Sequence, residues 1–197
     1  MICHALFWLK NRAELGHDLM NPAFLEARMK TELTHLDALL LGGVSFYGDP
    51  ISSKGSWDSE NEIGKTCKRF TGFLAENPGR PYSLNKPVLY EVHIYGSETP
   101  SKGYFEVFVG EEVNSAQLPV ALSTKYIASS DYLKVRLTGK EIVSDWWREL
   151  DPIIAAETRI ARNGSYIIQA YDERFKGMDR IDDSSLDVFI PIVRSQP

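Results

Sequence analysis

The amino-acid sequence predicts an α+β domain made of two strand-helix-strand-strand units that share an antiparallel sheet. The first observation is the order of patterns, which runs strand, helix, strand, strand from about residue 42 to 113 and again from about 126 to 193. The second is residues 166–193, where apolar and polar residues alternate as in a β-hairpin. The third is composition, because 197 residues of which 43% are hydrophobic can bury a substantial core.

Residues 1–41 are predicted to form an N-terminal helical extension. Asn21-Pro22 is a typical helix start, and the apolar residues after it recur at helical spacing: Phe24, Leu25, Met29, Leu33, Leu36 and Leu40. We expect this helix to pack on the domain or to form a homodimer contact. The segment is too short for a three-helix DNA-binding module, which needs roughly 50 residues.

The first unit begins with a strand over residues 42–49. A helix follows, capped by Asp58 or Ser59 and ending near Asn77, and its apolar stripe comprises Ile63, Cys67, Phe70 and Leu74. This position on the stripe predicts that Cys67 is a core residue rather than a nucleophile.

Two strands, over residues 88–95 and 104–113, complete the first unit. Glu91, His93 and Tyr95 share one face of the first of these strands, since alternate residues in a strand point the same way. A lone histidine on such a face is typical of a hydrogen-bonded neighbour rather than a metal ligand.

The second unit opens with an extended run over residues 118–137. Thr138 and Glu141 have the spacing of a capping box, which predicts a helix from about 140 to 151 that carries Ile142, Trp146 and Leu150. Asp151-Pro152 is expected to disturb or end it. Only one of Trp146 and Trp147 is expected to lie along the apolar stripe. The hairpin over residues 166–193 closes the fold and is expected to lie centrally or to seal the core.

The charge and cysteine content exclude several classes of protein. The formal net charge of −5 disfavours direct nucleic-acid binding, which usually requires a basic patch. The two cysteines and four histidines show neither disulfide nor metal-ligand spacing, so we expect no metal, no cofactor and a reducing, cytoplasmic location. No apolar stretch is long enough to span a bilayer, so we expect no membrane association.

Five segments together resemble a known family: YEVHIYGSET, GYFEVFVGEEV, KYIASSDYLKVRLTGK, DWWREL and YDERF…SSLDVFIPI. Their order and spacing are similar to the effector-binding domain of GyrI-like proteins, AraC-type and MerR-type multidrug regulators, and integron-associated effector-binding proteins. The resemblance divides the chain into the extension, 1–41, and an effector-binding domain, 42–197. It implies pseudo-twofold symmetry and a cleft between the halves, lined by aromatic residues and an acid, for amphipathic and often cationic compounds.

The resemblance implies a site with one departure from the family pattern. Gln169 occupies the position where the family has a glutamate, two residues before Tyr171. A glutamine keeps the hydrogen-bonding reach but loses the charge that would stabilise a buried cation. The remaining candidate ligand-binding residues are aromatic, with two acids as alternative charges: Trp146, Trp147, Tyr95, Tyr47, Glu91 and Glu149.

These observations predict a free-standing small-molecule-binding protein related to the ligand-sensing domains of transcription regulators. Two alternatives are a hydrolase of strained electrophilic toxins on the same fold and a protein-interaction module that inhibits a nucleic-acid enzyme. The replacement of the family glutamate by Gln169 disfavours the hydrolase, because that reaction needs a tuned acid or base. No catalytic residue is therefore predicted.

Overall fold

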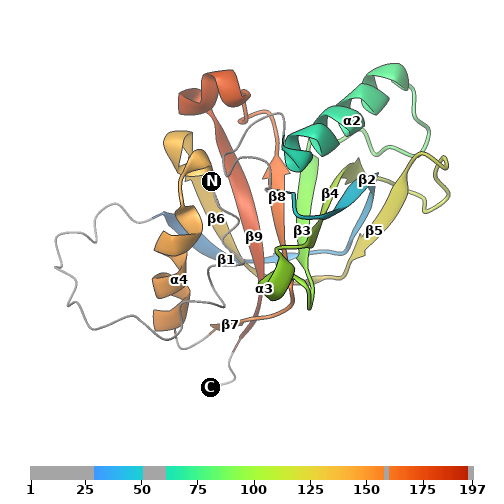
Figure 1. Ribbon diagram of the computed structural model, residues 1–197. Helices are drawn as coiled ribbons and strands as arrows, with labels where there is room; N and C mark the ends of the chain where they lie inside the picture. Colours follow the sequence, from blue (N-terminus) through green and yellow to red (C-terminus); the bar gives the residue numbers. More distant parts are fainter. Residues whose placement is uncertain (1–28, 51–60, 158–159, 195–197) are drawn as a thin grey trace.

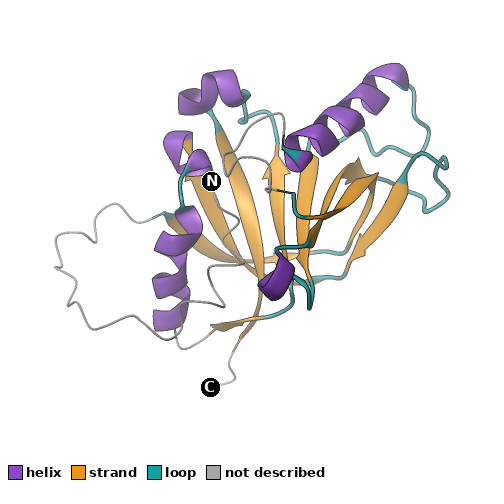
Figure 2. Ribbon diagram, viewed as in Figure 1, coloured by secondary structure: helices purple, strands orange, loops and turns teal. Residues whose placement is uncertain are grey.

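The computed structural model describes residues 29–50, 61–157 and 160–194, in which one antiparallel sheet carries helices on one face (Figures 1 and 2). The strand order is β1-β6-β9-β8-β3-β4-β2-β5, and β7 pairs with β9. The strands are β1 Lys30–Leu36, β2 Leu39–Gly48, β3 Leu89–Tyr95, β4 Phe105–Glu112, β5 Ser123–Ile127, β6 Ser130–Thr138, β7 Ile160–Arg162, β8 Tyr166–Tyr171 and β9 Ser185–Arg194. The helices are α2 Glu62–Glu76, α3 Thr99–Lys102 and α4 Trp146–Ala156, with short 3-10 helices η2 Gly139–Val143 and η3 Met178–Asp183.

The sheet order is symmetric about its centre, which confirms the predicted duplicated α+β fold. Counting inward from the two edges pairs β1 with β5, β6 with β2, β9 with β4 and β8 with β3. In chain order each half has two strands, then a helix, then two strands, and the second half has the short β7 in addition, between its helix and β8. The repeated unit therefore begins one strand earlier than the sequence predicts. The last strand, β9, lies between β6 and β8, as expected for a closing strand.

A long two-stranded ribbon joins the two halves. Residues 30–36 pair with 136–130, and residues 39–43 continue in the same register against 127–123. Only two residues separate β1 from β2, and only two separate β5 from β6. The ribbon therefore connects the two outer regions of the sheet, and Figure 1 shows β1 on the β6 side with the chain continuing across into β2.

The helix predicted up to residue 40 is wrong from residue 30 onward. Leu33, Leu36 and Leu40 have helical spacing, but in the structure they lie in β1 and β2 and pair with β6 and β5. The β-branched Thr31 and Thr34 favour the extended conformation. β2 also crosses the predicted boundary between residues 41 and 42. The predicted helix start and the expected homodimer contact fall in residues 1–28, outside the described residues.

Helix α2 matches the prediction in position and in its buried face. Ile63 and Phe70 pack with Val44, Val107 and Val109 of the underlying strands. The capping residue differs from the prediction: Asn61 accepts a hydrogen bond from the backbone N–H of Gly64 at 2.9 Å, whereas the expected caps lie in residues 51–60, outside the described residues.

The second predicted helix is divided into η2 and α4. The predicted capping box between Thr138 and Glu141 is present, but it begins the 3-10 helix. Asp145 then caps α4 by accepting a hydrogen bond from the backbone N–H of Arg148. α4 continues through Pro152 to residue 156, so of the two expected effects of this proline, disturbing or ending the helix, the second does not occur. Helix α4 packs over the second half of the sheet as α2 does over the first (Figure 2).

The opposite face of the sheet has a separate apolar core without a helix among its described members. Leu41, Phe108, Tyr132 and Ile168 are fully buried there and come from four different strands. Both faces of the central strands are therefore buried, which makes any polar residue on them costly unless it is hydrogen-bonded. No helix in the described segments is long and apolar enough to cross a membrane.

Candidate functional site

The most unusual polar group of the structure is the carboxylate of Glu91 in β3, whose residue is 0% exposed. His93 Nε2 lies 2.6 Å from its Oε1, and Gln169 Nε2 donates to the same oxygen at 3.1 Å. The Tyr171 hydroxyl donates to Oε2 at 3.3 Å, and the Cys67 thiol lies 3.8 Å from Oε2. We call these five residues the Glu91 cluster.

Sheet register brings the Glu91 cluster together. β3 and β8 pair so that Glu91 is directly opposite Gln169, and Leu89 is opposite Tyr171. Residues two apart in a strand share a face, so Gln169 and Tyr171 point to the same side as Glu91 and His93. The acidic group that the sequence lacks at position 169 is thus present on the adjacent strand.

The cluster lies in the seam between the two helical halves. α2 packs over β2 and β4, whereas α4 contributes to a core formed mainly with β6 and β9. Leu89 and Tyr95 of β3 contact both of these cores. β3 and β8 are the pair at the centre of the symmetric sheet, so the seam coincides with the position where the sequence predicted a cleft between halves.

Aromatic rings pack against His93 and Tyr171, two of the residues that contact the carboxylate. The ring centroid of Phe105 lies 5.2 Å from that of His93 and 5.4 Å from that of Tyr95. The Phe175 ring packs edge-on against Tyr171 at 4.9 Å. This arrangement gives the seam an apolar, π-rich lining around one charged group.

The Tyr171 and Cys67 partners of Glu91 are uncharged. Burial, and then the charge of Glu91, raises the pKa of Tyr171 well above its usual value. Burial also raises the pKa of Cys67, with Glu91 adding to the effect. Both groups therefore stay protonated and neutral at physiological pH. In the described segments no lysine or arginine forms an ion pair with Glu91, and only His93 offers it a titratable nitrogen.

The two tryptophans predicted as ligand residues are both buried in the core beneath α4. Trp146 and Trp147 pack edge to face with centroids 5.3 Å apart, and both join the core, although only one was expected to lie along the apolar stripe. The reason is the break before α4, which places Trp146 in the first turn of a new helix. The Arg162 guanidinium stacks over the Trp147 ring at 4.5 Å, and burial lowers its pKa.

The remaining predicted residues are distributed differently. Tyr95 lies beside the Glu91 cluster, with its ring 6.4 Å from that of His93. Tyr47 is 56% exposed and donates to Glu98 at 2.7 Å. Glu149 is exposed in the first turn of α4. The structure therefore brings together Glu91, Gln169, Tyr171 and Tyr95, and it places Tyr47 and Glu149 at the surface.

Sequence reasoning did not assign His93 or Cys67 to the site. His93 carried a usable signal, because it lies two residues after Glu91 on the same face of a strand. Cys67 carried none, since its contact with Glu91 depends on how α2 docks on the sheet. A buried carboxylate with neutral donors and an aromatic lining can bind an organic cation, and its pairing with an imidazole also allows acid–base chemistry.

No protein-family model and no curated protein sequence matches the chain. Several solved structures share its fold. An integron cassette protein from the mobile metagenome of Vibrio cholerae has a TM-score of 0.57 and 15% identity, over 83% of this chain and 95% of that one. SAV2435, solved with bound tetraphenylphosphonium, has a TM-score of 0.60 and 15% identity, over 84% and 94%. The C-terminal domain of EcmrR has a TM-score of 0.60 and 13% identity, over 85% and 99%.

These matches confirm, at the level of fold, the resemblance to GyrI-like effector-binding proteins that the sequence indicated. Each covers more than four fifths of this chain and nearly all of its counterpart. The TM-scores of 0.57–0.60 establish a shared fold, and the identities of 13–15% leave the ligand to be argued from the site.

Proposed function

We propose that this protein binds small molecules and takes an amphipathic, cationic aromatic compound at the Glu91 cluster. The observation that carries the proposal is the fully buried carboxylate without a lysine or arginine partner in the described segments. Burying a carboxylate is expensive unless a positive charge or strong donors compensate it. A bound organic cation would supply that charge.

The aromatic lining supports the same class of ligand. Rings such as Tyr95 and Phe105 bury apolar surface and also attract cations through their π faces, by about 0.5–2 kcal/mol each. Glu91 itself is inaccessible, whereas His93, Gln169 and Tyr171 each retain a little exposure. Binding at the carboxylate therefore requires these side chains to move, and they form the route to it.

The comparisons support the proposal by analogy of fold. SAV2435 has been solved with tetraphenylphosphonium, a hydrophobic aromatic cation. The EcmrR domain is part of a larger chain that was solved in complex with DNA. For the present chain we propose ligand binding without direct DNA binding, because its net charge is −5.

The test is calorimetric titration with tetraphenylphosphonium and with neutral triphenylphosphine oxide. Glu91→Gln should weaken binding of the cation by about tenfold or more, since a hydrogen-bonded or paired charge contributes roughly 1.5–3 kcal/mol. It should change binding of the neutral compound much less. Tyr171→Ala should weaken both, because the ring contributes contact area to either ligand.

Glu149→Gln is the matched control, because it removes the same charge from an exposed position on α4. Its affinities should equal those of the unmodified protein. Absence of cation binding, or equal loss of cation affinity in the Glu91 and Glu149 variants, would contradict the proposal.

A hydrolase is a second candidate, favoured by the 2.6 Å contact between Glu91 and His93 in a buried, aromatic site. Such a pair could activate a water molecule toward a strained electrophile. Incubation with an epoxide or aziridine of matching shape, followed by mass spectrometry, separates the two functions. A binding protein returns the compound unchanged, whereas a hydrolase adds one water molecule to it.

A further inference from the structure

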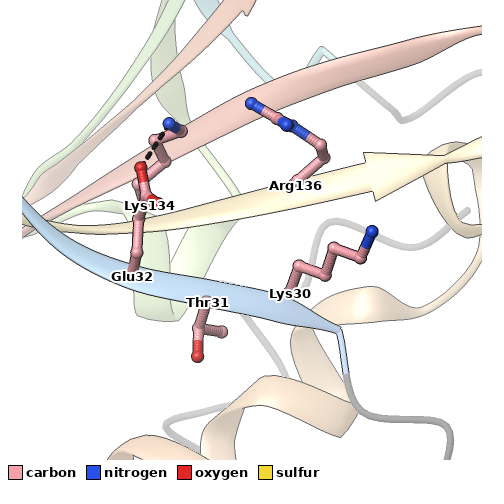
Figure 3. A pocket seen from close by; sticks show the side chains of 5 residues that line it. All are labelled: Lys30, Thr31, Glu32, Lys134 and Arg136. Atoms are coloured by element: carbon pink, nitrogen blue, oxygen red, sulfur yellow. Dashed lines mark hydrogen bonds and ion pairs between the residues drawn. The ribbon is translucent and has the colours of Figure 1, made fainter.

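A concave site lies on the β1–β6 ribbon, away from the Glu91 cluster. It has a volume of about 100 Å³ and is lined by Lys30, Thr31, Glu32, Lys134 and Arg136. We call it the β1–β6 pocket. The strand register places Lys30 opposite Arg136 and Glu32 opposite Lys134, so the four charged side chains share one face. Figure 3 shows the Glu32–Lys134 pair at one end, with Lys30 and Arg136 at the other.

Part of this charge cluster is structural. Arg136 donates from Nε and Nη2 to Asp187 of β9 at 2.9 and 3.2 Å, and Arg174 donates to the same carboxylate at 2.8 Å. Arg174 also binds Asp172 at 2.6 Å. The side chain of Asp187 is 9% exposed, so this network ties β6, β9 and the turn after β8 together. Two arginines and two aspartates thus neutralise each other.

The remaining charges do not balance. Lys134 pairs with Glu32, whose side chain is 61% exposed, and Lys30 forms no ion pair with an acid in the described segments. The cluster has four cations and three carboxylates, a formal surplus of one positive charge in a chain whose net charge is −5. Within the described residues, the Nη1 of Arg136 has no hydrogen-bond partner. The pocket is therefore lined by three donors, Lys30, Lys134 and Arg136. The exposed carboxylate of Glu32 beside them can be replaced by a ligand.

We propose that the β1–β6 pocket binds one phosphate group, free or as a phosphomonoester. If Glu32 rotates outward, the local charge rises from +1 to +2, and a phosphate dianion brings it to zero. A ligand with a single carboxylate would leave a local charge of +1, the same as with Glu32 in place, so it has no electrostatic advantage over Glu32. Arginine and lysine together match the tetrahedral oxygens of phosphate, with Lys30, Lys134 and Arg136 as donors. A site of about 100 Å³ suits one phosphate group rather than a polymer.

The test is calorimetric titration of the full chain with inorganic phosphate and with glycerol 3-phosphate at pH 8, at ionic strength matched with chloride. Lys30→Gln should weaken phosphate binding at least fivefold, and it should still fold, because Lys30 has no hydrogen bond or ion pair in the described segments. Glu32→Gln should strengthen binding at least threefold, because it removes the competing carboxylate. Lys140→Gln, at an exposed lysine of η2, is the matched control and should leave binding unchanged.

Opposite effects of the Lys30 and Glu32 substitutions support the proposal. Equal affinities for the two compounds would identify the phosphate group itself as the ligand, and tighter binding of glycerol 3-phosphate would identify a phosphomonoester. The proposal is overturned if phosphate does not bind, if Lys30→Gln has the same affinity as the Lys140→Gln control, or if Glu32→Gln weakens binding.

Discussion

Glu91→Gln should separate the stability of this protein from its ligand binding. The substitution keeps the shape of the side chain and removes a charge that is fully buried. We expect the free energy of unfolding of the unliganded protein to fall by less than about 1 kcal/mol or to rise by up to about 2 kcal/mol. The affinity for the cation should fall.

The magnitude follows from two opposing terms. Besides the weak thiol contact of Cys67, three hydrogen bonds from nitrogen and oxygen groups reach the carboxylate, from His93 at 2.6 Å, Gln169 at 3.1 Å and Tyr171 at 3.3 Å. Bonds to a charged group contribute about 1.5–3 kcal/mol each, and the two longer ones belong at the lower end, so the sum is roughly 5 kcal/mol. Desolvation of a buried carboxylate costs several kcal/mol, about the same amount.

A glutamine retains one acceptor oxygen and avoids most of the desolvation cost. The Tyr171 hydroxyl is not orphaned, because the Oε1 of Gln169 lies 3.3 Å from it. The substitution therefore replaces hydrogen bonds to a charged group by neutral ones of about 0.5–1.5 kcal/mol each. It also removes the desolvation cost of the carboxylate, which is about as large as the stabilisation that is lost.

Urea unfolding followed by circular dichroism measures this difference, provided that the slope with denaturant is unchanged. Glu149→Gln should stay within about 0.5 kcal/mol of the unmodified protein, as surface substitutions usually do. A loss of more than about 3 kcal/mol in Glu91→Gln would refute the reasoning. Such a loss would mean that Glu91 forms a structural ion pair with protonated His93.

Three further predictions concern the scaffold. Burial raises the pKa of Asp187, but its arginine partners outweigh that effect and lower the pKa below its usual value. Stability should therefore be lost as the pH falls from about 3.9 through the folded-state pKa. Asp187→Asn should reduce this loss of stability at low pH in pH-dependent urea titrations, and an unchanged slope of stability against pH would contradict the reasoning. A methyl group at Gly43 would lie 2.1 Å from a backbone oxygen of β4, so Gly43→Ala should cost about 3 kcal/mol in the same assay, whereas Gly72→Ala, with open space on α2, should be neutral or slightly stabilising. The raised pKa of Cys67 predicts slow alkylation by iodoacetamide at pH 8 until urea unfolds the protein, and rapid native labelling in peptide mapping would count against its burial beside the carboxylate.

Local patterns predicted much of the fold. The alternation in residues 88–95, 104–113 and 166–193 placed β3, β4, β8 and β9, and the stripe through Phe70 placed α2. The capping box at Thr138 correctly located the start of the 3-10 helix. These signals lie within a few residues of one another, so backbone propensity and amphipathic spacing are sufficient to detect them.

The sequence alone misassigned the segment that became β1. Its leucines fit a helical stripe, and the pairing that makes it a strand is with β6, about 100 residues away. The same is true of the break before α4, after which Trp146 and Trp147 both enter the core. Contacts with distant elements decided both outcomes over local spacing.

For the candidate site, the sequence determined which residue types were available, including an amide at position 169 and a carboxylate at position 91. Tertiary structure decided that the two touch. Gln169 and Glu91 are 78 residues apart and meet only because β8 and β3 pair in one register at the centre of the sheet. A shift of that register by one residue would turn both side chains to the opposite face, because alternate residues of a strand point to opposite sides. The packing of both halves holds the register, and local sequence does not encode it.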